Sequence, residues 1–190
     1  MMLKLHVPSI REMEYRQKLL AQPETMSYNA NMPYEADGYD VKTGCIDFPI
    51  QNWRYWRDVW LWHEPNRYSA YILNEETGEF VGEACYYYDM EEDMHGVGVI
   101  IEAKHRNKGF GAEATRLIAQ QAFRHPEVDC LFMDLPMNRE NAIRMALTAG
   151  FTEEKTELGI CRMILHSVAA APDHTDSAPS WERIESAAGT

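Results

Sequence analysis

The pattern of apolar and polar positions in the N-terminal part of the chain predicts a strand, a helix and a long loop. Residues 3–7 alternate between apolar and polar side chains, as a short strand does. Ser9 can cap a helix over residues 10–21, whose apolar positions fall near one face. Residues 22–48 carry several Pro, Gly, Asn and Asp residues and predict a loop, whose length is uncommon unless it has a function.

Aromatic side chains are frequent in the next two predicted elements. Residues 50–63 predict a helix that carries three tryptophans on one face, at Trp53, Trp56 and Trp60. These rings suit packing against a sheet, and the same positions are also suited to lining a pocket. Residues 68–74 and 79–88 are rich in β-forming side chains and flank a turn with glycine, so they predict a hairpin.

Strands and helices alternate in the second half of the chain. The pattern predicts strands over 96–102 and 130–135, a helix after Gly111, a helix over 139–149 that ends at Gly150, and a final strand pair, 151–158 and 160–166. Antiparallel strands followed by strands joined by helices predict an α/β (α+β) domain with one mixed sheet over residues 1–166. Residues 167–190 lack periodicity and predict a flexible tail.

Charge and composition narrow the classes of function. The 190 residues include 18 Lys and Arg against 30 Asp and Glu, for a net charge of −12. A chain this acidic is a poor general partner for nucleic acid or an anionic membrane. It shows neither an apolar run of membrane-spanning length nor a signal-peptide pattern, and its four cysteines have no C-x-x-C spacing. We therefore expect a cytoplasmic protein with reduced cysteines, and the histidine spacing predicts no metal site.

Residues 97–114 carry the clearest chemical signal. A strand ends there, and a loop with Gly109 and Gly111 leads into a helix. The first N–H groups of a helix are unpaired and carry partial positive charge, and glycine lets a ligand approach the backbone closely. Arg106 and Lys108 add cations beside those groups. The segment therefore predicts a site for phosphate or pyrophosphate.

Two other interpretations also fit this segment. A solvated charged turn at an ordinary helix start would show the same residues. Gly109, Gly111 and Ala114 also fit a relaxed dinucleotide-binding fingerprint, with Asp129 further on. However, the polar stretch 102–108 separates the strand from the glycines, and antiparallel hairpins precede it. No G-x-x-x-x-G-K-[ST] motif is present, which excludes a P-loop.

The motif resembles one family in particular. Residues 106–111 match R-x-x-G-x-G, the central signature of the GNAT family of N-acetyltransferases, and lie between a strand and a helix as that family has them. Residues 141–151 resemble its second motif, a helix that ends in Gly-Phe. The element order also agrees, so the resemblance covers residues 3–166. It implies a mostly antiparallel central sheet with flanking helices, and two strands, 97–102 and 130–135, that splay apart at the acyl-CoA site.

The resemblance also implies an activity and a set of ligands. The protein would transfer an acetyl group from acetyl-CoA to a primary amine by direct attack, without a metal. Its acceptor would be a small-molecule or peptide amine, and a homodimer is compatible with the aromatic residues. The backbone of one strand would pair with the pantetheine arm, at Val99, Ile100 and Ile101. The cofactor site would further include Arg106, Asn107, Lys108, Gly109, Phe110, Gly111, Ala112, Asn138 and Asn141.

The sequence departs from the family pattern at the proton donor. A tyrosine that protonates the thiolate often stands four residues before the glycine of Gly-Phe, and that position is Ala146. A water, a tyrosine from elsewhere or direct release of the thiolate are the alternatives. The departure also leaves open a second function, a catalytically silent acyl-CoA-binding or regulatory domain on the same fold.

Two carboxylates are candidates for the general base that takes the amine proton. Glu83 lies in a strand among aromatic residues, where burial would raise its pKa. Asp93 lies just before the next strand, and His95 is an alternative to both. Either acid could also be an ordinary surface group. The acceptor site is expected to include Tyr28, Asn29 and Tyr87, and the residues do not identify the amine.

Overall fold

The computed structural model describes residues 2–33 and 37–167. Within these residues seven strands form one sheet, in the order β1-β2-β3-β4-β5-β7-β6. Every neighbouring pair is antiparallel except β4 and β5. The strands are β1 Leu3–His6, β2 Arg67–Asn74, β3 Glu79–Asp89, β4 Met94–Ile101, β5 Cys130–Pro136, β6 Thr152–Glu157 and β7 Ile160–His166. The mixed, mostly antiparallel sheet is therefore confirmed.

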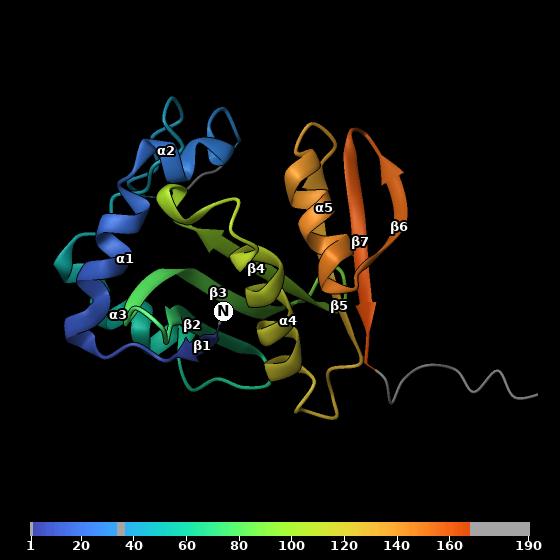
Figure 1. Cartoon of the computed structure of the whole chain (residues 1–190), viewed down its shortest axis with the longest axis horizontal. Helices are drawn as coiled ribbons and strands as arrows, with labels where there is room; N and C mark the ends of the chain where they lie inside the picture. The colour runs from blue at the N-terminus through green and yellow to red at the C-terminus, as the bar shows by residue number, and fades with distance from the viewer. Residues whose placement is uncertain (1, 34–36, 168–190) are drawn as a thin grey trace, which may run out of the picture.

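The helices lie on both faces of this sheet (Figure 1). They are α1 Met13–Leu20, α2 Pro23–Met26, α3 Ile50–Trp60, α4 Phe110–Ala122 and α5 Glu140–Ala149, with short 3-10 turns at Ile10–Glu12, Ser27–Asn29 and Ala103–His105. In Figure 1 helices α1 to α3 stand on one side, and α5 with β6 and β7 on the other. No helix in the described ranges is both long and apolar enough to cross a bilayer.

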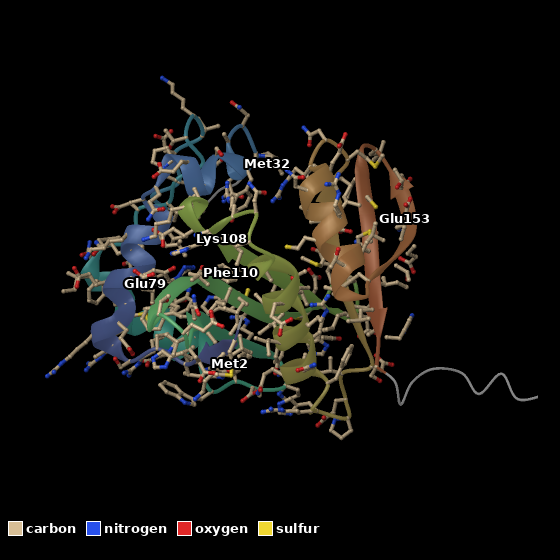
Figure 2. All side chains as sticks on the ribbon, in the orientation of Figure 1. Met2, Met32, Glu79, Lys108, Phe110 and Glu153 are labelled. Carbon is tan, nitrogen blue, oxygen red and sulfur yellow. The ribbon has the colours of Figure 1, made fainter. Side chains whose placement is uncertain are left out.

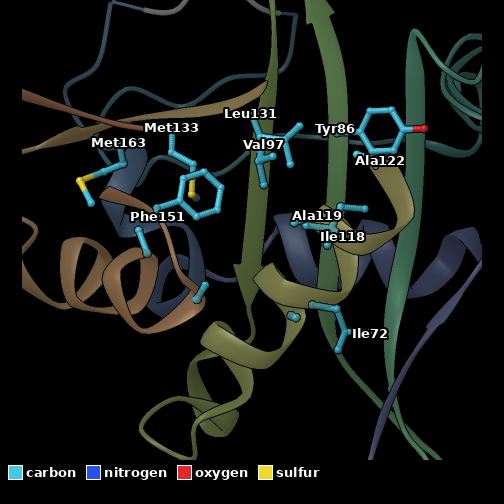
Figure 3. Packing of buried hydrophobic residues seen from close by; sticks show 14 of the residues in the cluster. Ile72, Tyr86, Val97, Ile118, Ala119, Ala122, Leu131, Met133, Phe151 and Met163 are labelled. Carbon is cyan, nitrogen blue, oxygen red and sulfur yellow. The ribbon is translucent and has the colours of Figure 1, made fainter. Parts of the chain in front are cut away.

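Strand alternation separates two apolar clusters. The larger cluster joins α4 to one face of the sheet and contains Tyr86, Val97 and Ile118. Figure 3 shows Ile118 and its neighbours on α4 facing these strands. The smaller cluster lies under α1 and α3, where Trp56 and Ile100 pack against its buried residues. Because side chains of a strand point alternately to the two faces, the residues between the core positions of β3 point toward α1 and α3.

Strands β4 and β5 pair in parallel at only two positions, His95 with Leu131 and Gly96 with Phe132. Beyond Gly96 no pairing continues, so β4 keeps its ladder with β3 while its other edge is free of β5. The backbone N–H and C=O groups on that edge are therefore open to a ligand. This divergence agrees with the splayed strands that the family resemblance implies.

The prediction of a loop over residues 22–48 is wrong for its first part, because α2 and a 3-10 turn occupy residues 23–29. Pro23 lies in the first turn of α2, where no helical N–H bond is required. Thr25 and Met26 are buried, so packing stabilises a helix that is too short to be periodic in sequence. The other helices and strands are confirmed, with bounds shifted by up to three residues. Apart from Ser167, the predicted tail lies outside the described residues.

Glu64 joins the start of β2 to the end of α4. Its Oε1 atom accepts hydrogen bonds from Tyr86 Oη at 3.3 Å, Gln121 Nε2 at 2.8 Å and His125 Nε2 at 3.1 Å. Partial burial tends to raise the pKa of Glu64, but the bonds from Gln121 and His125 outweigh it and hold this pKa below 4.5. The carboxylate therefore stabilises the fold only while it is ionised.

Glu64→Ala should lower the free energy of unfolding by about 1–3 kcal/mol, because the buried Tyr86 hydroxyl loses its partner. The melting temperature should fall by about 2–4 °C for each kcal/mol. Since the pKa of Glu64 is lowered in the folded state, the difference from wild type should be full above pH 4.5 and shrink as the pH falls below it. Thermal melts of both proteins between pH 3.5 and 7 measure this. A difference that does not change with pH would contradict the ionised role.

Candidate active site

A cavity of about 1030 Å³ opens where β4 and β5 diverge. One wall consists of β4 and the loop that leads into α4, and a second consists of β5 and α5. The N-terminal helices close the remaining side, through residues that include Arg16, Tyr28, Trp56 and Trp60. In Figure 2 Lys108 and Phe110 lie near the centre of the molecule, between the N-terminal helices and α5. The cavity therefore meets both the predicted phosphate loop and the predicted acceptor side.

The start of α4 has the geometry of an anion site. Asn107 and Gly109 have φ angles of 61° and 80°, and this left-handed backbone turns the loop sharply into the helix at Phe110. Gly109 is the N-cap and offers no side chain to the first N–H groups of α4. Those groups therefore have no partner within the helix and can bind phosphate oxygens. Asn107, Gly109, Phe110, Gly111 and Ala112 all line the cavity, and this donor set fits the pyrophosphate of CoA.

The Arg106 guanidinium is held by hydrogen bonds to the backbone and is not a free cation beside the α4 N–H groups. It donates hydrogen bonds to three backbone carbonyls, Ile101 O at 3.2 Å, Glu24 O at 3.1 Å and Thr25 O at 2.6 Å. The side chain thus ties the loop after β4 to α2. Lys108 is exposed and is not among the residues that line the cavity. Arg106 thus lines the cavity with its guanidinium held by carbonyls, whereas Lys108 lies outside the lining.

Arg106→Lys keeps the positive charge but cannot reach three carbonyls at once. We expect the unfolding free energy to fall by about 1–2 kcal/mol and acetyl-CoA binding to weaken about tenfold, because the loop loses its alignment. Lys108→Gln removes a nearby charge without touching the carbonyls, and should leave the melting temperature unchanged. Thermal melts and calorimetry with acetyl-CoA measure both effects. Wild-type values for Arg106→Lys would show that charge alone matters at this position.

The free edge of β4 suits an extended ligand. Val99, Ile100 and Ile101 all line the cavity, as the resemblance implies for the pantetheine arm. A chain of amide groups can pair with an open strand edge as a further strand does. Asn138 and Asn141 line the cavity on the opposite wall. Ala146 occupies the position where the family often has a tyrosine, and it is fully buried in the larger cluster, so this position offers no proton donor.

Glu83 lies in the cavity on the side of α1 and α3. The residue is 8% exposed, and its two carboxylate oxygens accept hydrogen bonds from Arg16 Nη1 at 2.9 and 3.3 Å. Burial raises the pKa of Glu83, and the positive charge of Arg16 offsets part of that rise. Burial also raises the pKa of the neighbouring Cys85 thiol to about 12, so this thiol stays neutral. Glu83 is thus a buried carboxylate with increased affinity for a proton.

The other candidate bases lie elsewhere. Asp93 is in the turn between β3 and β4, where it accepts a hydrogen bond from the Tyr88 hydroxyl, and it does not line the cavity. His95 is buried, donates to the Pro65 carbonyl at 3.1 Å and also lies outside the lining. Burial lowers the pKa of His95. Of the three candidates, only Glu83 lies in the cavity.

Of the three predicted acceptor residues, only one lies in the cavity lining. Tyr28 lines the cavity, and the Arg139 guanidinium lies 4.6 Å above its ring. Asn29 is buried outside the lining, and its backbone carbonyl accepts a hydrogen bond from Tyr39. Tyr87 is also outside the lining, with its ring edge-on to Trp60 at 6.2 Å. Tyr87 therefore supports a cavity wall rather than forming one.

Sequence reasoning missed Arg16, which has the closest contact to the candidate base. Arg16 is 67 positions before Glu83 and lies on a helix that shows no motif, so no local pattern could have linked the two. The spacing of Trp56 and Trp60 predicts that they share one helix face suited to a pocket, and both line the cavity. Their rings stack at 6.1 Å with an interplanar angle of 19°.

Comparisons with known proteins agree with this fold and site. The model of the acetyltransferase (GNAT) family matches residues 35–151, more than half of the chain. The chain therefore belongs to the GNAT family of acetyltransferases. No curated protein is significantly similar to it in sequence.

Solved structures of acetyltransferases share the fold. Spermidine N-acetyltransferase from Vibrio cholerae, solved with CoA and spermine, is 15% identical with a TM-score of 0.64, covering 86% of this chain and 95% of its own. Aminoglycoside acetyltransferase AAC(6')-Ib, solved with coenzyme A and kanamycin, is 17% identical with a TM-score of 0.62, covering 86% and 93%. The microcin C7 self-immunity acetyltransferase MccE, solved with acetyl-CoA and AMP, is 13% identical with a TM-score of 0.65, covering 87% and 92%.

Proposed function

We propose that this protein transfers an acetyl group from acetyl-CoA to a primary amine by direct attack, with Glu83 as the general base. The observation that carries the proposal is the buried Glu83 carboxylate, which lines the same cavity as the unpaired N–H groups of α4. The GNAT-fold neighbours crystallised with CoA or acetyl-CoA support acetyl-CoA as the donor. Four free cysteines agree with a reducing, cytoplasmic location.

The chain's own residues hold the donor by backbone groups. The first turn of α4 binds the pyrophosphate through N–H groups and its helix dipole. The free edge of β4, from Val99 to Ile101, aligns the pantetheine arm as an additional strand. Gly111 keeps space open beside Met145 of α5, because a Cβ atom at this position would lie 2.8 Å from the Met145 sulfur. These contacts bring the thioester end of the donor toward the point where β4 and β5 diverge.

Glu83 takes a proton from the acceptor amine. Acetyl-CoA supplies the acetyl group as a thioester, whose carbon–sulfur bond breaks as the amine nitrogen bonds to the acetyl carbon. Only a neutral amine can attack, so a base must take its proton, and burial brings the pKa of Glu83 closer to neutrality than that of an ordinary carboxylate. At position 146 α5 provides alanine instead of a hydroxyl. We therefore assign protonation of the departing sulfur to water.

An acetyl-CoA turnover assay against a panel of amines tests the proposal. Release of free CoA thiol, dependent on both an amine and the wild-type enzyme, is the expected result. Acetyl-CoA binding measured by calorimetry on the same preparation separates the alternative function. Tight binding without turnover of any amine would identify the chain as a silent acyl-CoA-binding domain, for which the alanine at position 146 is the motivating feature.

A further inference from the structure

The acceptor side of the cavity contains an ion pair rather than a lone carboxylate. Arg16 and Glu83 are joined at 2.9 Å, and their side chains are 15% and 10% exposed. The Arg16 guanidinium also lies 4.4 Å from the Trp56 ring centroid and 5.0 Å from that of Phe48. Two aromatic rings and a carboxylate therefore hold this guanidinium in place beside the base.

The Arg16 guanidinium has donors left over. Both contacts to Glu83 come from the single atom Nη1, although a guanidinium carries five N–H bonds. Among the described residues, Arg16 Nε is buried and has no hydrogen-bond partner. Burying such a donor is unfavourable, so a ligand oxygen that approaches the guanidinium would be bound favourably.

Charge at the cavity contrasts with charge on the whole protein. Within residues 2–33 and 37–167, four arginines line the cavity against three acids, in a chain of net charge −12. Of those acids, Asp134 is already paired with Arg162 at 2.6 Å. Arg106 lies beside the proposed phosphate site at the start of α4, whereas Arg16 lies on α1, beside the proposed base. A second positive group on the acceptor would meet Arg16 there and be repelled, whereas a negative group would be attracted.

We propose, on the basis of the function proposed above, that the acceptor is a free α-amino acid, whose amine is directed to Glu83 and whose carboxylate is bound by Arg16. In an α-amino acid the ammonium and carboxylate are separated by one carbon, which matches a base and a guanidinium 2.9 Å apart. The stacked rings of Trp56 and Trp60 offer a flat apolar wall. The side chain of the amino acid is therefore aromatic or large and apolar.

Matched acceptors that differ only in the carboxylate test this assignment. Tryptophan is compared with tryptamine, phenylalanine with phenethylamine, and leucine with isoamylamine, with spermidine as a polycation. Each amino acid should have a kcat/KM about 10- to 100-fold higher than its decarboxylated analogue, because the analogue leaves the Arg16 donors unpaired. Spermidine should be the poorest acceptor.

Arg16→Gln should abolish this preference, because kcat/KM should fall about 10- to 100-fold further for the amino acids than for the analogues. Arg16→Lys, which keeps the charge, should restore part of it. Arg11→Gln is the matched control, because Arg11 is exposed in the preceding 3-10 turn and lies outside the cavity. Acetyl-CoA affinity should be unchanged in all three variants.

The pH profile gives a readout that a purely structural role would not move. Arg16 lowers the pKa of Glu83, so Arg16→Gln should move the acid limb of kcat/KM to higher pH when both enzymes use the same acceptor. In the part of the chain that the structure describes, the other titratable groups influenced by the charge of Glu83 are Tyr15, Tyr71 and Cys85. Burial raises the pKa of all three, so none of them titrates near neutrality.

The outcomes separate this proposal from the one on which it rests. If the decarboxylated amines or spermidine react as well as the amino acids, the amino-acid assignment is overturned while the acetyltransferase function stands. If acetyl-CoA binds but none of the amines reacts, the proposed function itself fails. Should Arg16→Gln not fold, the matched pairs measured on the wild-type enzyme still decide the question.

Discussion

Gly111→Asp should weaken acetyl-CoA binding by about 100- to 1000-fold in a protein that still folds. The carboxylate would lie in the first turn of α4, where we propose that the N–H groups bind the pyrophosphate. Two like charges about 4 Å apart repel by about 4 kcal/mol at the effective dielectric of a protein surface, which corresponds to roughly three orders of magnitude in affinity. An acid near a helix N-terminus is favourable for the helix itself, so the fold should persist.

Gly111→Ala separates the effect of charge from that of space. Its Cβ atom would approach the Met145 sulfur at 2.8 Å, and Met145 is a flexible side chain that can move aside. We expect at most a tenfold loss of affinity in this control. Calorimetric titration with acetyl-CoA and with CoA measures both variants, and circular dichroism checks the fold. Unchanged affinity in a folded Gly111→Asp protein would remove the phosphate site from α4.

Glu83→Gln should reduce kcat by about 10²- to 10⁴-fold, the usual cost of losing a general base. The amide keeps the shape of the side chain and can still accept a hydrogen bond from Arg16, so the KM for acetyl-CoA should change little. Loss of the negative charge leaves Arg16 without an ionic partner, and some fall in melting temperature is expected. Rates are therefore measured well below the melting temperature of the variant.

Asp93→Asn is the matched control for Glu83→Gln. Asp93 accepts a hydrogen bond from Tyr88 in the β3–β4 turn and lies outside the cavity, so kcat should stay near the wild-type value. A near-normal kcat in Glu83→Gln would contradict the assignment of the base. A selective loss in Asp93→Asn would move the role to the turn, through a rearrangement that brings its carboxylate to the cavity.

Local signals in the sequence were sufficient for most of the fold. Apolar periodicity found the strands and the longer helices, because a strand repeats every two residues and a helix every 3.6. It failed for α2, whose four residues are too few to show a period and are held by the burial of Thr25 and Met26. The family signature located the loop that leads into α4, because the left-handed backbone at its N-cap favours glycine at position 109.

The sequence by itself thus determined the fold class and the position of the glycine loop before α4, because both follow from local patterns. Only the tertiary structure decided which charges meet. Arg16 comes to Glu83 across 67 positions, Arg106 turns to carbonyls of α2 about 80 positions away, and Asp93 is left outside the cavity. Pairing between distant side chains depends on how helices pack against the sheet, and that packing leaves no pattern within any single segment.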